Sequence, residues 1–280
     1  MASNKVYCVV GGTSGLGASV VKALSGSGST VFVGGRTLPS SSSTPSSSPS
    51  TSITYKSLDV KSLKQSIAFA DFVRTSKQVQ ENGLAGLVLT AGNFNFALSR
   101  STTTEGIEST LALNALSKLA IINRLLPDLE RVPDSRVVSV LAGGNGGPFK
   151  PDDIQLKSNY NCVSQAIQTG VLVDLFTVHL ASLNTSPSSP KFFHMFPGLM
   201  NTNNPTNANL PFYVTYPLKF VLPILGRSPD TVATEVVTLL QSEEWKAKSG
   251  ALVHPGLKTV KPYAKVWKEC NDLIQEVINS

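Results

Sequence analysis

Three glycines of the chain have the spacing and the surroundings of a phosphate-binding turn. Gly11, Gly15 and Gly17 lie between the apolar run 6–10 and the segment 18–24, whose apolar residues follow helical spacing. This order predicts a buried strand, a tight turn and a helix. Glycine lets the backbone turn sharply and approach a ligand, and the free N–H groups at a helix start favour a pyrophosphate. We therefore expect a nucleotide site, the alternative being an ordinary glycine-rich turn.

A second candidate residue ends the next apolar run, 30–36. This end lies about 20 residues past the glycines, where dinucleotide-binding proteins read the ribose. A carboxylate there would bind the 2′-hydroxyl of NAD, but this chain has Gly35 followed by Arg36. Because an arginine can pair with a 2′-phosphate, the sequence predicts NADP(H) as the cofactor. A surface arginine at a strand end is the alternative interpretation.

The spacing Gly11-x-x-x-Gly15-x-Gly17 resembles that of the short-chain dehydrogenase/reductase family, whose usual leading threonine is Val10 here. Asp59, at the end of the strand predicted for 53–58, is similar to the family's aspartate that contacts the adenine amino group. The resemblance implies a doubly wound, three-layer α/β fold of the Rossmann type, with a mainly parallel seven-stranded sheet in a single domain.

Two further turns are similar to cofactor-binding turns of the family. Ala91-Gly92 matches the end of its Asn-Asn-Ala-Gly motif, although both asparagines are replaced. Pro197-Gly198 matches its Pro-Gly-x-Val-x-Thr motif at the nicotinamide, with the threonine at Thr202. The resemblance thus implies a cofactor site made by Gly11, Thr13, Ser14, Gly15, Leu16, Gly17, Arg36, Asp59, Val60, Ala91, Gly92, Asn114, Pro197, Gly198 and Thr202.

The catalytic half of the resemblance is a negative match. The family's catalytic serine falls on Ala142, in the strand predicted for 136–144. Ser139 is three residues earlier and, by alternation along a strand, is expected to face the opposite side of the sheet from Ala142. The segment 152–161 resembles the retinol-dehydrogenase-like branch, and counting from its tyrosine places the catalytic tyrosine and lysine on Ala166 and Gly170.

Three residues remain as candidates for proton transfer. Asn114 lies in the helix predicted for 104–129, where the resemblance implies that it holds a water of the proton relay; a buried amide satisfied by backbone is the alternative. Tyr160 and Asp153 precede the altered helix. Tyr160 is the better candidate of these two, and its alternative is a packing tyrosine at a helix start. His194 is interpreted as a sheet residue near the site entrance.

Three functions are consistent with this pattern. The first is an NADP(H)-dependent oxidoreductase that acts on a small hydrophobic carbonyl or alcohol with catalytic residues other than the family's usual serine, tyrosine and lysine. The second is a non-redox isomerase or cyclase on the same scaffold, and the third is a catalytically inactive NADP(H)-binding protein. We expect a substrate lid at about 203–227. Its part 211–225 is aromatic and apolar, which is why the substrate is expected to be hydrophobic; a membrane-surface contact or core packing is the alternative for this part.

The composition bounds the remaining possibilities. The chain has 280 residues, 41% hydrophobic, enough for one large α/β domain, with a Ser/Pro-rich loop at 38–52 that is expected to be disordered. Three scattered cysteines suggest neither disulfides nor a metal site. The net charge of +6 is spread without a basic block, so no nucleic-acid partner is expected. No transmembrane segment or signal peptide is expected either, which predicts a cytoplasmic protein, with a homodimer left open.

Overall fold

The computed structural model describes residues 5–25, 28–39, 52–93, 99–200 and 226–260. Three of the expectations above lie outside these residues: almost all of the Ser/Pro-rich loop, the lid up to residue 225, and Thr202. The sequence pattern also predicts a closing amphipathic helix at 263–278, and this segment lies outside the described residues as well.

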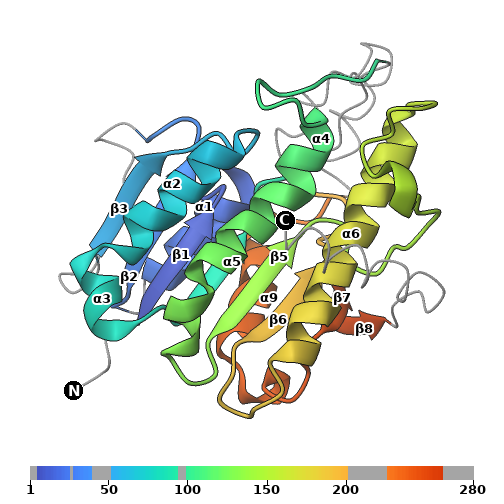
Figure 1. Ribbon diagram of the computed structural model, residues 1–280. Helices are drawn as coiled ribbons and strands as arrows, with labels where there is room; N and C mark the ends of the chain where they lie inside the picture. The colour runs from blue at the N-terminus through green and yellow to red at the C-terminus, as the bar shows by residue number, and fades with distance from the viewer. Residues whose placement is uncertain (1–4, 26–27, 40–51, 94–98, 201–225, 261–280) are drawn as a thin grey trace.

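The centre of the molecule is a sheet whose strands are ordered β3-β2-β1-β4-β5-β6-β7-β8 (Figure 1). Every neighbouring pair from β3 to β7 is parallel, which confirms the predicted α/β fold with a mainly parallel sheet. An eighth strand, which the sequence pattern does not indicate, returns antiparallel to β7 as a hairpin. The strands are β1 (Val6–Val10), β2 (Thr30–Gly35), β3 (Ser52–Ser57), β4 (Gly86–Leu89), β5 (Arg136–Val140), β6 (Lys191–Met195), β7 (Ala251–His254) and β8 (Lys258–Val260).

Helices cover both faces of this sheet because successive strand residues point to opposite sides. On one face Val9 and its neighbours pack against α1 (Gly15–Ser25) and α9 (Pro229–Gln241). On the other face Cys8 and its neighbours pack against α2 (Leu63–Arg74) and α5 (Ser117–Glu130). Helix α6 (Cys162–Leu183) lies on this second face beside α5 (Figure 1). The short elements are α3 (Lys77–Asn82), α4 (Ser109–Leu111), and the single turns η2 (Pro151–Asp153) and η3 (Glu243–Trp245).

The long helix predicted for 104–129 is broken in two ways. It begins only at Ser109, because the buried carboxylate of Glu108 accepts the N–H groups of Thr110 and Leu111 and so caps the helix start. One turn later the chain widens into a π-helix, η1 (Ala112–Leu116), before α5 continues. Asn114 lies in this π-turn, an element that is frequent at functional sites.

Among the described helices, α6 alone is long and apolar enough to cross a membrane by length and composition. Most of its apolar window, 67%, is buried inside the fold. This is the burial expected of a core helix, and α6 packs on the sheet and on α5 accordingly.

Candidate functional site

The turns that follow the parallel strands meet at one edge of the sheet, and a crevice is expected where the strand order reverses. Here that point lies between β1 and β4, since the chain runs from β1 to β2 and β3 on one side and from β4 onward on the other. The two turns touch: a β-carbon built on Gly11 would lie only 2.7 Å from the backbone nitrogen of Ala91. The predicted glycine turn and the predicted Ala91-Gly92 turn are therefore neighbours.

The glycine turn needs its glycines for geometric reasons. Gly11 and Gly15 have φ angles of 85° and 52°, in the left-handed region that favours glycine. A β-carbon on Gly17 would overlap the carbonyl oxygen of Gly11. The N–H groups of Gly11 and Gly12 both donate to the carbonyl oxygen of Gly34, at 2.7 and 3.2 Å, which ties the turn to β2.

The predicted residues of this turn divide into two groups. Leu16 and Gly17 are buried in the packing of α1, whereas Ser14 and Gly15 are exposed at the helix start and Thr13 is half-buried. The exposed start of α1 leaves its first N–H groups accessible to an anion. These residues can therefore hold a phosphate group.

The ribose-reading position is shaped by the same turn. A β-carbon on Gly35 would overlap the side chain of Thr13, so this contact excludes a carboxylate as well as any other side chain. Arg36 follows immediately and is exposed. At the end of the next strand Asp59 is half-buried, and its carboxylate accepts the N–H of Lys61 at 3.0 Å, while Val60 is buried.

The turn after β4 is held from one helix face. Asn114 donates from Nδ2 to the carbonyl oxygen of Asn93 at 2.8 Å and accepts the Asn93 N–H at 2.9 Å. This bonding is the backbone-satisfied amide given above as the alternative for Asn114. One turn along, the Lys118 ammonium donates to the carbonyl oxygens of Leu89 at 2.9 Å and Ala91 at 2.7 Å. Lys118 is not among the predicted site residues, and a lysine four positions after Asn114 on an apolar face is the signal that could have found it.

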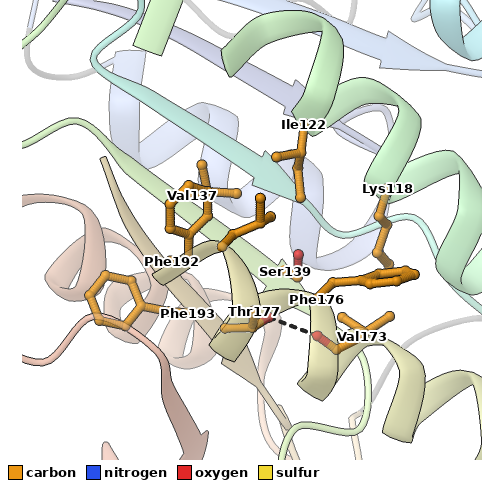
Figure 2. Close-up of a pocket in the computed structure, with 10 residues that line it drawn as sticks. Lys118, Ile122, Val137, Ser139, Val173, Phe176, Thr177, Phe192 and Phe193 are labelled. Atoms are coloured by element: carbon orange, nitrogen blue, oxygen red, sulfur yellow. Dashed lines mark hydrogen bonds between the residues drawn. The ribbon is translucent and has the colours of Figure 1, made fainter. Parts of the chain in front are cut away.

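The end of β5 corrects one expectation. Strand β5 ends at Val140, so the alternation assumed for 136–144 does not extend to Ala142. Ser139 faces a cavity between the sheet and the helices, on the same side as Lys118, Phe176 and Thr177 (Figure 2). Ala142 faces α6 as well, because a β-carbon on Gly170 would lie 3.1 Å from the Ala142 β-carbon. The expectation of opposite sides is therefore wrong, since the chain turns between the two residues.

A buried ionisable pair holds the loop that carries Ala142. His194 Nδ1 lies 2.6 Å from Asp174 Oδ1, and His194 Nε2 accepts the Ala142 N–H at 3.3 Å. Because Nε2 acts as an acceptor, this hydrogen-bond network assigns the ring proton to Nδ1. Asp174 also accepts the Gly144 N–H, at 3.0 and 3.2 Å to its two oxygens. His194 is a sheet residue as expected, but its pairing with Asp174 was not predicted.

Tyr160 and Asp153 lie in separate surroundings. Tyr160 is half-buried beside Thr110 and Glu108, and burial, reinforced by the Glu108 carboxylate, raises the pKa of its hydroxyl. Asp153 accepts the N–H groups of Ser158 at 3.0 Å and Lys157 at 2.8 Å, and these bonds lower the pKa of its carboxyl. Among the hydrogen bonds of the described residues, none joins either side chain to Asn114.

The turn after β6 is fixed from α9. Gly198 has a φ of 80°, and the carbonyl oxygen of Pro197 accepts a hydrogen bond from Arg227 at 2.9 Å. The Arg227 guanidinium also pairs with Glu235 on α9. Within the described ranges, no group of three or more His, Cys, Asp or Glu residues is arranged to hold a metal ion.

Comparisons with known proteins agree with this geometry. The family model described as short chain dehydrogenase matches residues 5–150, more than half of the chain. Among curated proteins, Oxidoreductase AN1596 of Emericella nidulans is 31% identical over 205 residues, which cover 71% of this chain. They cover 59% of that protein, so the chain spans less than two thirds of its length.

Solved structures share the fold. A short-chain type dehydrogenase/reductase from Mycobacterium ulcerans has a TM-score of 0.63 at 19% identity, covering 90% of this chain and 88% of that chain. The Pseudomonas aeruginosa RhlG/NADP active-site complex has a TM-score of 0.63 at 18% identity, covering 91% of this chain and 95% of that chain. The residues matched by the family model end before α6 begins at Cys162.

Proposed function

Because this chain belongs to the short-chain dehydrogenase/reductase family of NAD(P)-dependent oxidoreductases, we propose that it binds NADP(H) and acts on a hydrophobic carbonyl or alcohol. The observation that carries the cofactor choice is the contact between Gly35 and Thr13, beside the exposed Arg36. The contact leaves no room for a carboxylate that would repel a 2′-phosphate, and Arg36 supplies the charge that would bind it.

The residues of the crevice fit a dinucleotide. The backbone approaches closely at Gly11 and Gly17, where side chains would fill the space, and the start of α1 offers N–H groups to a pyrophosphate. Gly35 and Arg36 would border the adenosine ribose, and Asp59 would border the adenine. Ala91, Gly92, Pro197 and Gly198 belong to the turns that would border the nicotinamide half.

NADPH, when bound, supplies a hydride, and the protein must then supply a proton to the carbonyl oxygen of the substrate. We place Ala142, Ala166 and Gly170 at the positions where the family has its serine, tyrosine and lysine, and the proximity of Ala142 to Gly170 supports this register. None of these three side chains can donate a proton. The proton must therefore come from another group of the chain or from the substrate.

Tyr160 is the better candidate for that group. Its phenol is protonated at neutral pH, as a general acid requires, but burial raises the pKa of this phenol and so makes it a weaker proton donor. The lowered pKa of Asp153 keeps that carboxylate ionised, and its two backbone hydrogen bonds give it a structural role in its loop. Asn114 forms hydrogen bonds with the backbone of Asn93. We therefore assign it to holding the turn after β4 rather than to moving a proton.

A second function is favoured by the same register. If no group replaces the missing acid, the chain is an NADP(H)-binding protein without turnover. Assays of Tyr160→Phe and Asp153→Asn, with NADPH affinity measured separately, distinguish the two functions. We expect Tyr160→Phe to lower the turnover rate and leave NADPH affinity unchanged, and unchanged rates in both variants would remove these residues from the mechanism.

Calorimetric titration of the full chain tests the cofactor proposal. We expect NADPH to bind about 5- to 150-fold more tightly than NADH, the equivalent of roughly 1–3 kcal/mol from one charge-assisted contact. Arg36→Ala should remove the preference, whereas Lys22→Ala, at an exposed position on α1, should retain it. Equal affinities for the two cofactors in the unchanged protein would overturn the proposal.

A further inference from the structure

Lys118 is a buried amine that the proposed chemistry does not use. The residue is 3% exposed, and in the described part of the chain no carboxylate forms an ion pair with it. A lysine is rarely buried without a partner, because removing its charge from water is costly. Its position on α5 therefore needs a reason beyond packing.

The two carbonyl oxygens that Lys118 holds belong to the end of β4 and to the turn that follows. Leu89 is the last residue of β4, and Ala91 lies in the turn that borders the proposed cofactor site. Asn114, one helical turn earlier, binds both backbone groups of Asn93 in the same turn. One face of the η1–α5 segment thus binds the end of β4 and this turn through four hydrogen bonds, two of them from Lys118.

The space around Lys118 separates it from substrate and cofactor. It lines the cavity that also contains Ser139 and Thr177, enclosed by apolar residues of α5, α6, β5 and β6 (Figure 2). The Thr177 hydroxyl donates to the Val173 carbonyl oxygen at 2.8 Å. The cavity has a volume of about 10 Å³, too small for a nicotinamide ring. Lys118 acts on the site only through the turn that it binds.

We propose that Lys118 is the positioning residue of the turn after β4, which borders the proposed cofactor site. This inference rests on the proposed cofactor site. It makes cofactor affinity depend on the protonation of a side chain that never touches the cofactor.

The direction of this dependence follows from burial. Burial lowers the pKa of Lys118 to about 7, from its ordinary value of 10.5. The ammonium forms stronger hydrogen bonds to carbonyl oxygens than the neutral amine does, so the turn is held most firmly below pH 7. NADPH affinity should decrease as the pH rises through this value.

The same pKa predicts the opposite trend in stability. Since the unfolded chain keeps its lysine protonated up to about pH 10, the burial penalty is full below pH 7 and disappears between pH 7 and 10. The contribution of Lys118 to stability should therefore rise with pH over this range.

Other titratable groups on the surrounding elements are engaged elsewhere. Asp174 and His194, on α6 and β6, bind one another, and β4 has no titratable residue. The remaining groups lie toward the other ends of these elements and include Asp71, Arg74, Arg124 and Asp128 between α2 and α5, His179 on α6, Arg136 on β5 and Lys191 on β6.

The test compares Lys118→Met and Lys118→Arg with the exposed control Lys22→Met. NADPH affinity is measured by titration from pH 6 to 9, and stability by denaturant over the same range. We expect Lys118→Met to weaken NADPH binding about 10-fold at pH 6 and to abolish the pH dependence of affinity. Lys118→Arg should restore affinity and make it independent of pH, because arginine stays charged. An affinity profile of Lys118→Met equal to that of the unchanged protein would overturn the inference.

One further measurement does not depend on the variants, and a second does not depend on the cofactor. If Lys118→Met does not fold, NMR titration of the Lys118 side chain in the unchanged protein decides: a midpoint near pH 7 supports the inference, and one near 10 overturns it. If the unchanged protein does not bind NADPH, the proposed function fails. Amide exchange at Asn93 then decides the role of Lys118, since faster exchange in Lys118→Met supports it and unchanged exchange overturns it.

Discussion

At the scale of residues, the contact between Gly35 and Thr13 is the one on which the proposed cofactor choice depends. Thr13 occupies the space in which a side chain at position 35 would begin, so the turn after β1 and the end of β2 are matched to one another. The absence of an acidic residue at position 35 is therefore a steric requirement as well as an electrostatic preference. A carboxylate could be introduced there only if Thr13 were reduced in size.

We expect Gly35→Ala to lower the free energy of unfolding by about 1–3 kcal/mol, as is typical when a methyl group is added to a filled space. Thr13→Ala alone should change it by less than about 0.5 kcal/mol, because Thr13 is not deeply buried. The double variant should recover most of the loss, since alanine lacks both atoms that overlap with position 35. Denaturant unfolding of the four proteins measures this coupling, and additive effects would show that the two side chains do not meet.

At the scale of elements, helix α2 is capped by its own Ser62, and a carboxylate from a distant segment completes this cap. Glu105 accepts the Ser62 hydroxyl at 2.7 Å and the N–H groups of Leu63 at 2.9 Å and Lys64 at 3.2 Å. A carboxylate at a helix start is favoured both by the free N–H groups and by the helix dipole. The hydrogen bond from Ser62, followed by those from the backbone, lowers the pKa of Glu105.

This lowered pKa predicts a pH-dependent contribution to stability. A carboxyl whose pKa is lower in the folded chain stabilises fully above its ordinary value of 4.5, and the stabilisation is lost as the pH falls through the lowered value. Glu105→Gln should therefore have a lower Tm than the unchanged protein at pH 7, and the difference should shrink below pH 4.5. Thermal unfolding from pH 3 to 7 measures it, with Glu130→Gln, at an exposed position on α5, as the control. A constant difference across this range would exclude the charge of Glu105 as its cause.

Helix α6 offers a direct test of the catalytic register. A β-carbon at position 170 would approach only the β-carbon of Ala142, at 3.1 Å, so a small displacement would admit it. We expect the triple variant Ala142→Ser, Ala166→Tyr, Gly170→Lys to reduce simple ketones at least about 100-fold faster than the unchanged protein, as restoring a general acid should do. Ala166→Tyr alone should gain much less, because the three groups act as a unit.

NADPH consumption followed by absorbance measures this gain. The variant must first be shown to fold and to bind NADPH as the unchanged protein does. If it meets both conditions and remains inactive, the three residues are not at the catalytic positions and the register is wrong.

At the scale of the whole molecule, the fold is predictable from the sequence because it depends on local pattern. Continuous apolar runs that end in glycines indicate β1 and β2, and the order of strands and helices indicates the parallel sheet. The eighth strand, Lys258–Val260, could not be predicted because three residues are too few to show an alternation of apolar and polar side chains. The late start of the helix at Ser109 was missed because it depends on the side chain of Glu108.

The candidate site was predictable only in part. Residues required by local backbone geometry could be predicted, and residues that depend on distant partners could not. Glycines leave a local signal, because the backbone geometry that requires them is set by adjacent residues. A lysine on an apolar helix face marks Lys118, but the sequence does not identify its partners or pair Asp174 with His194. These partners lie 20 to 29 positions away and meet only once the sheet has formed. Their burial follows from the order of the strands, which residue types alone do not specify.

The position of Cys8 makes its alkylation rate a measure of how often the central sheet opens. Cys8 is fully buried in the middle of β1, and burial raises the pKa of its thiol far above the ordinary value. Since the thiolate is the reactive form, an alkylating reagent can modify Cys8 only after β1 has left the sheet. Cys162, half-exposed at the first residue of α6, needs only a local opening. The two alkylation rates thus report the opening of the whole sheet and the fraying of one helix end in the same sample.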